Sequence, residues 1–390
     1  MLRRIRFSLL AGAAILFALP LSGQNLPDLD KGQELLEIHH INIGQGAATL
    51  IFGPGPDSTR RSILIDCGDL NGPDGGAIVY SYLRAEEVDT LDIFIATHYD
   101  ADHIGGLVTG RPTFGMSFML GPNGVPGAEG DDDGDGKKDW LGSNKIEFDV
   151  KEFGRDDDIV VRRFIDRGTE KMPRSKTFKK YDFLTSNVGE KIVLDDAEDI
   201  KASEIDLGSG ATLTCVAGNG YVRGKMRRIN LAKSENERSL CYWLSYGGFD
   251  YLIGGDLIGK RGTDSGPEDS RLEYEVGRWM KKNGVELDVY NSNHHGANNT
   301  GEMAFLNLVK PEVAVISVGD NSHGHPHPDH LGRLIGSGVQ RIYQTNIGQP
   351  EWRVSKYLQS HRKIAGTNRH VVIRSDGTRY AVNGDEYPVD

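Results

Sequence analysis

Four side chains that commonly bind metal ions fall within six consecutive residues of this chain. They are His98, Asp100, Asp102 and His103, in the segment Thr97–Gly106. The segment directly follows an apolar run, 91–96, that reads as a buried strand. Side chains at alternate positions of an extended turn project to one side, so we expect His98, Asp100 and Asp102 to converge on one ion. His103 is then expected to turn toward a second ion, and the glycines that follow allow the chain to bend tightly around both.

Three further polar clusters follow apolar runs later in the chain. Asp256 comes after Tyr251–Ile253 and two glycines, and His294 and His295 come shortly after Leu287–Tyr290. His325 lies in a third cluster, 322–327, which follows Val313–Val318. Each cluster alone is a weak signal, because Gly-Gly-Asp and His-His-Gly are common in turns. Open α/β sheets place their sites at the carboxyl ends of strands, so the four clusters together predict one site.

Short apolar runs alternate with helical patterns over two stretches of the chain. Strands are predicted at 36–43, 48–52, 62–66, 91–96, 239–245, 251–253, 287–290 and 313–318, and helices at 78–87, 273–282 and 303–308. This alternation indicates an α/β layered sandwich. Residues 111–235 are polar and rich in glycine, and we predict that they form a large loop-rich insertion.

The motifs resemble those of the metallo-β-lactamase superfamily. His98-x-Asp100-x-Asp102-His103 looks like the superfamily signature His-x-His-x-Asp-His, with Asp100 in place of the middle histidine. This variant is similar to the metallo-β-lactamase-like domain of ComEC-type DNA-uptake proteins. The remaining motifs of the resemblance are Gly44-Gln45-Gly46, Leu64-Ile65-Asp66-Cys67-Gly68, Asn236-Glu237-Arg238-Ser239, Gly255-Asp256, His294-His295-Gly296 and Gly324-His325-Pro326.

The resemblance implies a four-layer αββα sandwich, with two divalent metal ions at one edge. It implies that Asp256 bridges the two ions and that a histidine of the His294-His295 pair completes one ligand shell, without deciding which. Asn236 stands where the family usually has a histidine. With Asp100, this makes the ligand set richer in oxygen, so manganese or magnesium becomes an alternative to zinc.

A metal pair of this kind lowers the pKa of a bound water and supplies hydroxide near neutral pH. The sequence therefore predicts a metal-dependent hydrolase. Asp102 is the expected proton acceptor for the water and is also a candidate ligand. His325, on a glycine-flanked loop, is the candidate for contacting the substrate or protonating the leaving group.

Residues 1–23 have the features of a signal peptide. Three arginines precede a 15-residue apolar run, and Leu-Ser-Gly before Gln24 is an acceptable cleavage site. We therefore expect a periplasmic or secreted protein, with residues 24–390 as one domain and no stable membrane association after cleavage. Three cysteines, Cys67, Cys215 and Cys241, allow at most one disulfide bond and do not indicate a pairing.

The predicted insertion contains a candidate calcium loop at 131–142. Asp131, Asp133, Asp135 and Asp139 have the 1, 3, 5, 9 spacing of such loops, and Gly136 stands at the position of the sharp turn. Gly142 replaces the usual Glu at position 12, so the segment is either a shorter calcium loop or a solvated acidic hairpin.

Two basic stretches are candidates for contacts with phosphate groups. Residues 162–180 contain Arg162, Arg163, Arg167, Lys171, Arg174, Lys176, Lys179 and Lys180, and the second stretch contains Arg223, Lys225, Arg227 and Arg228. Phe164, Phe178 and Tyr181 could supply stacking faces for bases. The alternative is a solvated surface that offsets the formal net charge of −11.

Three functions are compatible with the sequence. The first is a phosphodiesterase or nuclease whose substrate is a nucleic acid or another phosphodiester. The second is a hydrolase of a carboxylic substrate such as a β-lactam, lactone or thioester. The third is a calcium-dependent binding protein without catalysis on the same fold, because fold alone does not determine function.

Overall fold

The computed structural model describes residues 35–56, 60–68, 75–108, 116–117, 121–122, 159–229, 234–260, 271–348, 361–366 and 368–389. The predicted signal peptide at 1–23 and the candidate calcium loop at 131–142 lie outside these residues, and both stay predictions. Within the described ranges, no helix is long and apolar enough to cross a bilayer.

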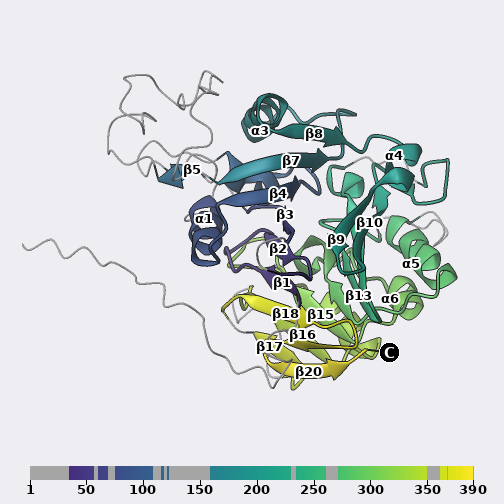
Figure 1. Ribbon diagram of the computed structural model, residues 1–390. Coiled ribbons are helices and arrows are strands. Elements are labelled where there is room, and N and C mark those ends of the chain that lie inside the picture. The colour runs from purple at the N-terminus through teal and green to yellow at the C-terminus, as the bar shows by residue number, and fades with distance from the viewer. Residues whose placement is uncertain are drawn as a thin grey trace, which may run out of the picture.

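Two large sheets form the centre of the molecule (Figure 1). The first sheet contains, in spatial order, β20 (Asp385–Pro388), β19 (Arg379–Val382), β18 (Val371–Ser375), β1 (Leu36–His40), β2 (Thr49–Phe52), β3 (Ser62–Ile65), β4 (Thr90–Ile95), β7 (Val160–Asp166) and β8 (Glu190–Val193). The strands from β3 to β8 run parallel, and the strands from β20 to β3 run antiparallel.

The second sheet has the same mixture of directions. Its order is β11 (Tyr221–Val222), β10 (Ala211–Gly218), β12 (Cys241–Tyr246), β13 (Phe249–Ile253), β14 (Val289–Asn291), β15 (Val313–Ile316), β16 (Arg341–Gln344) and β17 (Ile364–Gly366), and β9 (Glu204–Gly208) pairs with β10. The strands from β13 to β17 run parallel, and the other pairs are antiparallel.

Helices cover the outer faces of both sheets (Figure 1). α1 (Gly75–Ala85) and α3 (Lys176–Asn187) pack on the first sheet, and α5 (Leu272–Lys282), α6 (Met303–Val309) and α7 (Pro328–Gly336) pack on the second. The short helix α2 (Ala101–Ile104) follows β4, the short helix α4 (Ala197–Ala202) packs against β10 and β11, and β5 (Met116–Ser117) pairs with β6 (Gly121–Pro122).

Three apolar layers separate these four layers of secondary structure. The central layer joins the inner faces of the two sheets, for example Ile63 and Ile95 of the first with Tyr251 and Val315 of the second. Each outer layer joins one sheet to its helices. Burial of one apolar face per element explains why the alternating runs in the sequence form this sandwich, and the predicted αββα architecture is confirmed.

Residues 160–222 differ from the expected loop-rich insertion. β7 and β8 extend the first sheet, and β9, β10 and β11 form one side of the second. The charged residues in β7 hide its alternation in the sequence, although Val161, Phe164 and Ile165 are buried. The domain boundaries at 24 and 390 stay predictions.

The three cysteines are free and lie in three different apolar layers. Cys67 packs between the first sheet and α1, Cys215 between the sheets, and Cys241 between the second sheet and its helices. Cys215 and Cys241 are on neighbouring strands but face opposite sides of the sheet. The disulfide bond that the sequence left open is therefore absent from these three residues.

Candidate metal centre

All the predicted metal ligands meet at one edge of the two sheets. His98, Asp100, Asp102 and His103 follow β4, Asp256 follows β13, and His294 and His295 follow β14. Asn236 precedes β12, which runs antiparallel to β13, so the start of β12 lies beside the end of β13. The carboxyl ends of the parallel strands and the start of an antiparallel one thus deliver the ligands to the same place.

Asp256 lies between two groups of side chains. Its Oδ1 is 3.1 Å from Nε2 of His103 and 3.6 Å from Nε2 of His295. Its Oδ2 is 3.6 Å from Nε2 of His294 and 3.9 Å from Nε2 of His98. Each carboxylate oxygen therefore faces two imidazoles, which is the arrangement expected of a carboxylate that bridges two cations.

The first ligand group consists of Asp102, His103, Asp256 and His295. Their nearest ligand atoms all lie within 4.8 Å of one another, and Asp102 Oδ2 is 3.2 Å from His295 Nε2. Three of the four residues are buried, and Asp102 is partly exposed. These two carboxylates and two imidazoles can converge on one divalent ion.

The second ligand group consists of His98, Asp100, Asp256 and His294, with Asn236 beside them. Nε2 of His98 is 3.5 Å from Oδ2 of Asp100, and Nδ2 of Asn236 is 3.1 Å from Nε2 of His294. This group is more open than the first, because Asp100 and His294 are partly exposed. It also offers two imidazoles and two carboxylates.

The two ligand groups change the predicted place of Asp102 and answer the question of which histidine, His294 or His295, belongs to the site. Asp102 faces the same ion position as His103, not that of His98, because α2 begins at Ala101 and the extended turn ends there. His294 and His295 both belong to the site, one in each group. Both have left-handed backbone angles, φ +49° and +52°, so successive side chains reach opposite sides of Asp256.

Hydrogen bonds on the far side of the rings orient three of the histidines. His103 Nδ1 donates to Asp66 Oδ2 at 2.7 Å, and His295 Nδ1 donates to the carbonyl oxygen of Ser317 at 2.8 Å. Thr97 donates its hydroxyl proton to Asp66 at 2.7 Å, so its oxygen accepts from His98 Nδ1 at 3.1 Å. In each neutral ring Nε2 therefore carries the lone pair, and Nε2 is the atom that faces Asp256.

These orientations fit a metal ion well. The Nε2 atoms of His98, His103 and His295 and the Oδ1 of Asp256 are buried without a hydrogen-bond partner. Lone pairs of imidazole and carboxylate that face one another repel unless a cation or proton lies between them. An ion in the first group would satisfy His103, His295 and the Oδ1 of Asp256, and an ion in the second group would satisfy His98.

The electrostatics of the centre are dominated by its carboxylates. Burial raises the pKa of Asp256, but His103, His295 and His294 outweigh burial and hold that pKa well below its usual value. Burial lowers the pKa of His103, but Asp256, Asp66 and Asp102 outweigh it and raise that pKa well above its usual value. The negative potential that retains a proton at this position also favours a divalent cation.

Two catalytic roles were predicted, for Asp102 and His325. Burial raises the pKa of Asp102, but His103 and His295 lower it below its usual value, which makes this carboxylate a better ligand than base. Burial, with His294 and His295 nearby, lowers the pKa of His325 to about 3. The ring of His325 is thus neutral at neutral pH, and it suits a hydrogen-bond contact to a substrate better than proton donation.

A cavity of about 340 Å³ opens beside the ligands. It is lined by Gln45, Asp100, Ala101, Asp102, Asn236, Asp256, His294, His295, His323 and His325. His323 stacks on His325 with ring centroids 5.9 Å apart, and His325 is 5.2 Å from His294. Gln45 and His323 were not singled out from the sequence, although both stand in segments that carry motifs.

Asn321 organises the loop that carries His323 and His325. Its Oδ1 accepts the backbone N–H groups of His323, Gly324 and His325, and its Nδ2 donates to the carbonyl oxygens of Gly319 and His325. His327, the third histidine of the motif, does not line the cavity and instead accepts from the N–H of Asp329 at the start of α7.

Several residues of the two predicted basic stretches pair with acidic residues or backbone carbonyl oxygens, and the predicted aromatic residues lie in the core. Phe164, Phe178 and Tyr181 are buried, so the expected stacking faces are absent from these positions. Arg162 pairs with Asp92, Arg163 with Glu190, Arg167 with Glu235, Lys225 with Glu275 and Arg228 with Glu170. Arg223 donates to the carbonyl oxygens of Ile200, Ser203 and Cys215.

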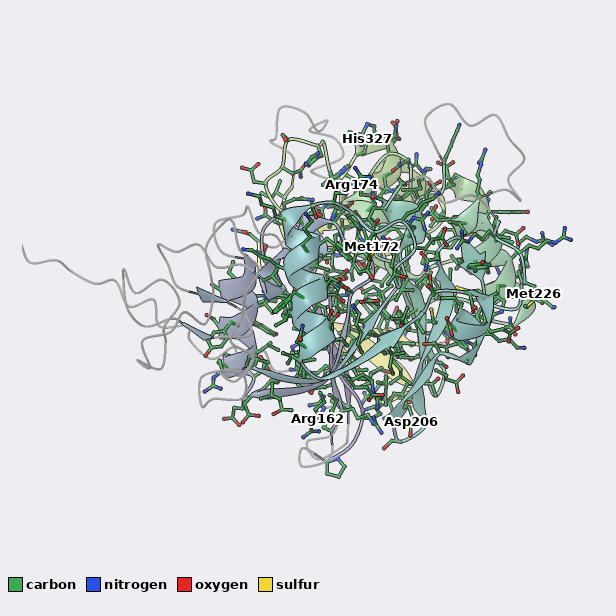
Figure 2. All side chains as sticks on the ribbon, turned by 90° about the horizontal axis from the view of Figure 1, so that it is seen from above. Arg162, Met172, Arg174, Asp206, Met226 and His327 are labelled. Carbon is green, nitrogen blue, oxygen red and sulfur yellow. The ribbon has the colours of Figure 1, made fainter. Side chains whose placement is uncertain are left out.

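Figure 2 shows Arg162 near the lower edge of the view and Arg174 in its upper half. Arg174 and Lys179 are exposed beside α3.

A family model of the metallo-beta-lactamase superfamily matches residues 41–170, which include the first ligand motif. The match covers a third of the chain and confirms the resemblance seen in the motifs: over these residues the chain is similar to the metallo-β-lactamase superfamily. A fold of this type implies divalent metal ions.

Among curated proteins, the chain is similar to ComE operon protein 3 of Bacillus subtilis (strain 168), with 21% identity over 331 residues. The aligned region is 81% of this chain and 33% of that protein, so the chain spans about a third of the length of its relative.

Solved structures with a similar arrangement include the metallo-beta-lactamase fold protein YhfI from Bacillus subtilis, with 9% identity and a TM-score of 0.39 over 79% of this chain and 95% of that one. A diphosphatase from the PhnP family gives 13% identity and a TM-score of 0.36 over 86% and 96% of the two chains. The β-hydroxylase CmlA from Streptomyces venezuelae gives 11% and 0.38 over 87% and 54%.

Proposed function

We propose that this chain is an exported phosphodiesterase or nuclease that hydrolyses its substrate at a pair of divalent ions. The observation that carries the proposal is the position of Asp256, whose two oxygens each face two imidazole nitrogens on opposite sides. Two ions held by one carboxylate suit an in-line displacement at phosphorus, because both the attacking and the leaving oxygen need charge stabilisation.

The lining of the cavity supports a phosphodiester over a carboxylic substrate. Apart from Ala101, every lining residue is polar or charged. Pockets for drug-sized organic ligands such as β-lactams are lined predominantly by apolar and aromatic side chains. The small, singly charged phosphodiester group matches a polar cavity of this size better.

The residues of the chain have separate tasks in this proposal. Asp102, His103, Asp256 and His295 would hold one ion, and His98, Asp100, Asp256 and His294 the other. When bound, the ions would activate a water molecule and neutralise charge on the phosphate oxygens. His325, His323 and Gln45 would donate hydrogen bonds to the substrate from the wall of the cavity.

Two imidazoles and two carboxylates in each group form a mixed nitrogen and oxygen set. Such a set suits manganese and zinc, whereas magnesium and calcium prefer oxygen ligands alone. We therefore propose zinc or manganese in both positions.

Activity assays on the purified, metal-loaded chain test the proposal. We expect hydrolysis of bis-p-nitrophenyl phosphate, and of single- or double-stranded DNA or RNA, with no turnover of a chromogenic cephalosporin. Hydrolysis of the cephalosporin alone would favour the carboxylic alternative. Failure on every phosphodiester, with metal bound, would overturn the proposal.

Export and calcium binding are parts of the same proposal that rest on sequence alone. The segment at 1–23 supports export, and the similarity to ComE operon protein 3 is compatible with a nucleic acid substrate. The spacing of Asp131, Asp133, Asp135 and Asp139 supports a structural calcium ion. Calorimetry that detects no binding at millimolar calcium would exclude that ion.

A further inference from the structure

Arg167 is a fully buried arginine close to the metal centre. Its Nε and one terminal nitrogen donate to the two carboxylate oxygens of Glu235 at 2.7 and 2.8 Å, and its other terminal nitrogen donates to the carbonyl oxygen of Glu170 at 2.8 Å. The two parallel bonds to one carboxylate give this pair a defined geometry. A buried guanidinium with this many partners holds the chain segments around it in a fixed arrangement.

The pair also holds the loop that carries His98 and Asp100. Tyr99, which stands between them, donates its backbone N–H to Glu235 Oε1 at 2.9 Å. The guanidinium of Arg167 lies 4.2 Å from the centroid of the Tyr99 ring, and the Tyr99 hydroxyl donates to the carbonyl oxygen of Gly168 at 2.9 Å. Backbone, ring and hydroxyl of Tyr99 are therefore all fixed by the Arg167–Glu235 region.

Glu235 is followed by a segment that reaches the remaining members of the second ligand group. Asn236 contacts His294, and the Ser239 hydroxyl accepts the backbone N–H of Asp256 at 3.2 Å. Leu240 N–H donates to the carbonyl oxygen of Thr97 at 2.8 Å. One short segment thus connects the loop after β4 with Asp256 and His294.

The first ligand group is held by other contacts. His103 is oriented by Asp66, which also accepts the backbone N–H of Thr97 at 2.8 Å, and His295 is oriented by the carbonyl oxygen of Ser317. None of these three contacts includes Arg167 or Glu235. The contacts that orient His103 and His295 are therefore separate from the Arg167–Glu235 pair, although Asp66 also orients His98 through Thr97.

We infer that Arg167 and Glu235 are a positioning pair for the second metal ion. The pair binds no ion itself. The pair sets the distance between two segments, the loop that carries His98 and Asp100 and the segment that carries Asn236. These two segments together flank Oδ2 of Asp256. The inference rests on the proposed two-ion centre and adds that the second ion depends on a buried ion pair that the first does not need.

The test compares metal binding in three variants of the full chain. Glu235→Gln keeps the shape of the side chain and removes its charge, and Arg167→Lys keeps the charge and removes the paired hydrogen bonds. The matched control is Glu37→Gln, because Glu37 pairs with Arg60 and Arg374 near the start of β1, in the first sheet. Manganese titration with metal analysis after gel filtration gives the number of ions and both dissociation constants.

We expect the wild type and the control to bind two ions. In Glu235→Gln and Arg167→Lys the first ion should keep its dissociation constant, and the second should bind at least about 10-fold more weakly, as for other residues that orient ligands. Circular dichroism and the retained first ion show that each variant is folded. Paramagnetic resonance should show loss of the coupling between two manganese ions.

Unchanged binding of both ions in both variants would overturn the inference. Equal weakening of both ions would also overturn it, because that result indicates general destabilisation and no selective role. Fewer than two ions in the wild type would instead overturn the proposed two-ion centre, and the positioning role with it.

Discussion

The Nδ1 atom of His103 donates a 2.7 Å hydrogen bond to Oδ2 of Asp66, which lies just beyond the end of β3. Both residues are buried, and the same oxygen of Asp66 accepts the Thr97 hydroxyl. One carboxylate thus orients His103 directly and His98 through Thr97. In the sequence, Asp66 stands out as part of a turn motif and not as a residue of the metal centre.

Substitution of this carboxylate should weaken metal binding without removing a ligand. In Asp66→Asn the amide can donate as well as accept, so His103 and His98 lose the partner that keeps their Nε2 lone pairs directed at the centre. We expect metal affinity to fall about 10- to 100-fold, measured by competition with a chelator. Affinity equal to that of the wild type would show that the rings are oriented by other contacts.

Loss of the bridging carboxylate should be more severe. Asp256→Ala leaves both ligand groups without their shared member, so both ions should be lost, whereas His103→Ala should remove chiefly the ion of the first group. Phosphodiesterase activity should fall at least about 100-fold in each. Mass spectrometry of the metal content beside the activity assay checks the expectation. Two tightly bound ions in Asp256→Ala would contradict the bridge.

The wall of the cavity should affect catalysis without affecting metal content. His325→Ala and His323→Ala remove imidazoles that line the cavity, and we expect kcat/KM for a phosphodiester to fall about 10- to 100-fold for His325, as expected when hydrogen bonds to a charged group are lost. His327→Ala is the control, because His327 is not among the residues that line the cavity. Parallel metal analysis should give the wild-type content in all three. An equal loss in the control would contradict the proposed role.

Exposed basic residues beside α3 should contribute to nucleic acid binding more than the paired arginines of β7. Each phosphate contact that is lost should reduce the slope of log K against log salt by about 0.9 for duplex DNA. We expect Arg174→Gln with Lys179→Gln to lower this slope, and Arg162→Gln, whose side chain pairs with Asp92, to leave it nearly unchanged. Fluorescence anisotropy at several salt concentrations measures it. Identical slopes in all variants would exclude a contact at α3.

Glu273 should make stability depend on pH. Its buried carboxyl accepts from Asn293 and the backbone of Gly301, and burial raises its pKa to about 7, against 4.5 for an exposed glutamate. The unfolded chain loses this proton first as the pH rises, so the free energy of unfolding falls between about pH 4.5 and 7. Glu273→Gln keeps an oxygen acceptor and should remove this pH dependence, which amounts to at most about 3.5 kcal/mol at 1.4 kcal/mol per pKa unit. Denaturant titrations at pH 5 and 8 give the comparison, and an unchanged slope would contradict it.

The elements nearest the centre could be predicted from sequence because local patterns determine them. The predicted strand 91–96 overlaps β4 (Thr90–Ile95), and 313–318 contains β15 (Val313–Ile316), since each is a short apolar run followed by polar residues. β7 could not be predicted, because Arg162 and Arg163 interrupt its apolar pattern. Their partners Asp92 and Glu190 lie on neighbouring strands, 70 and 27 residues away along the chain.

The site could be predicted as a set of residues but not as two groups. The grouping depends on where α2 begins and on the left-handed backbone at His294 and His295, and neither follows from residue spacing. The Arg167–Glu235 pair could not be predicted either, because Arg167 stands in a run of basic residues that looks continuous in the sequence.

The two left-handed residues have a consequence for how this centre can change during evolution. A residue other than glycine in this conformation costs of order 1–3 kcal/mol, and here two occur in succession. Glycine at either position would relax the backbone but would remove an imidazole from one side of Asp256. A substitution that stabilises the fold at this turn therefore weakens metal binding. In a series of variants selected only for thermal stability, one of these histidines is expected to be among the first residues replaced.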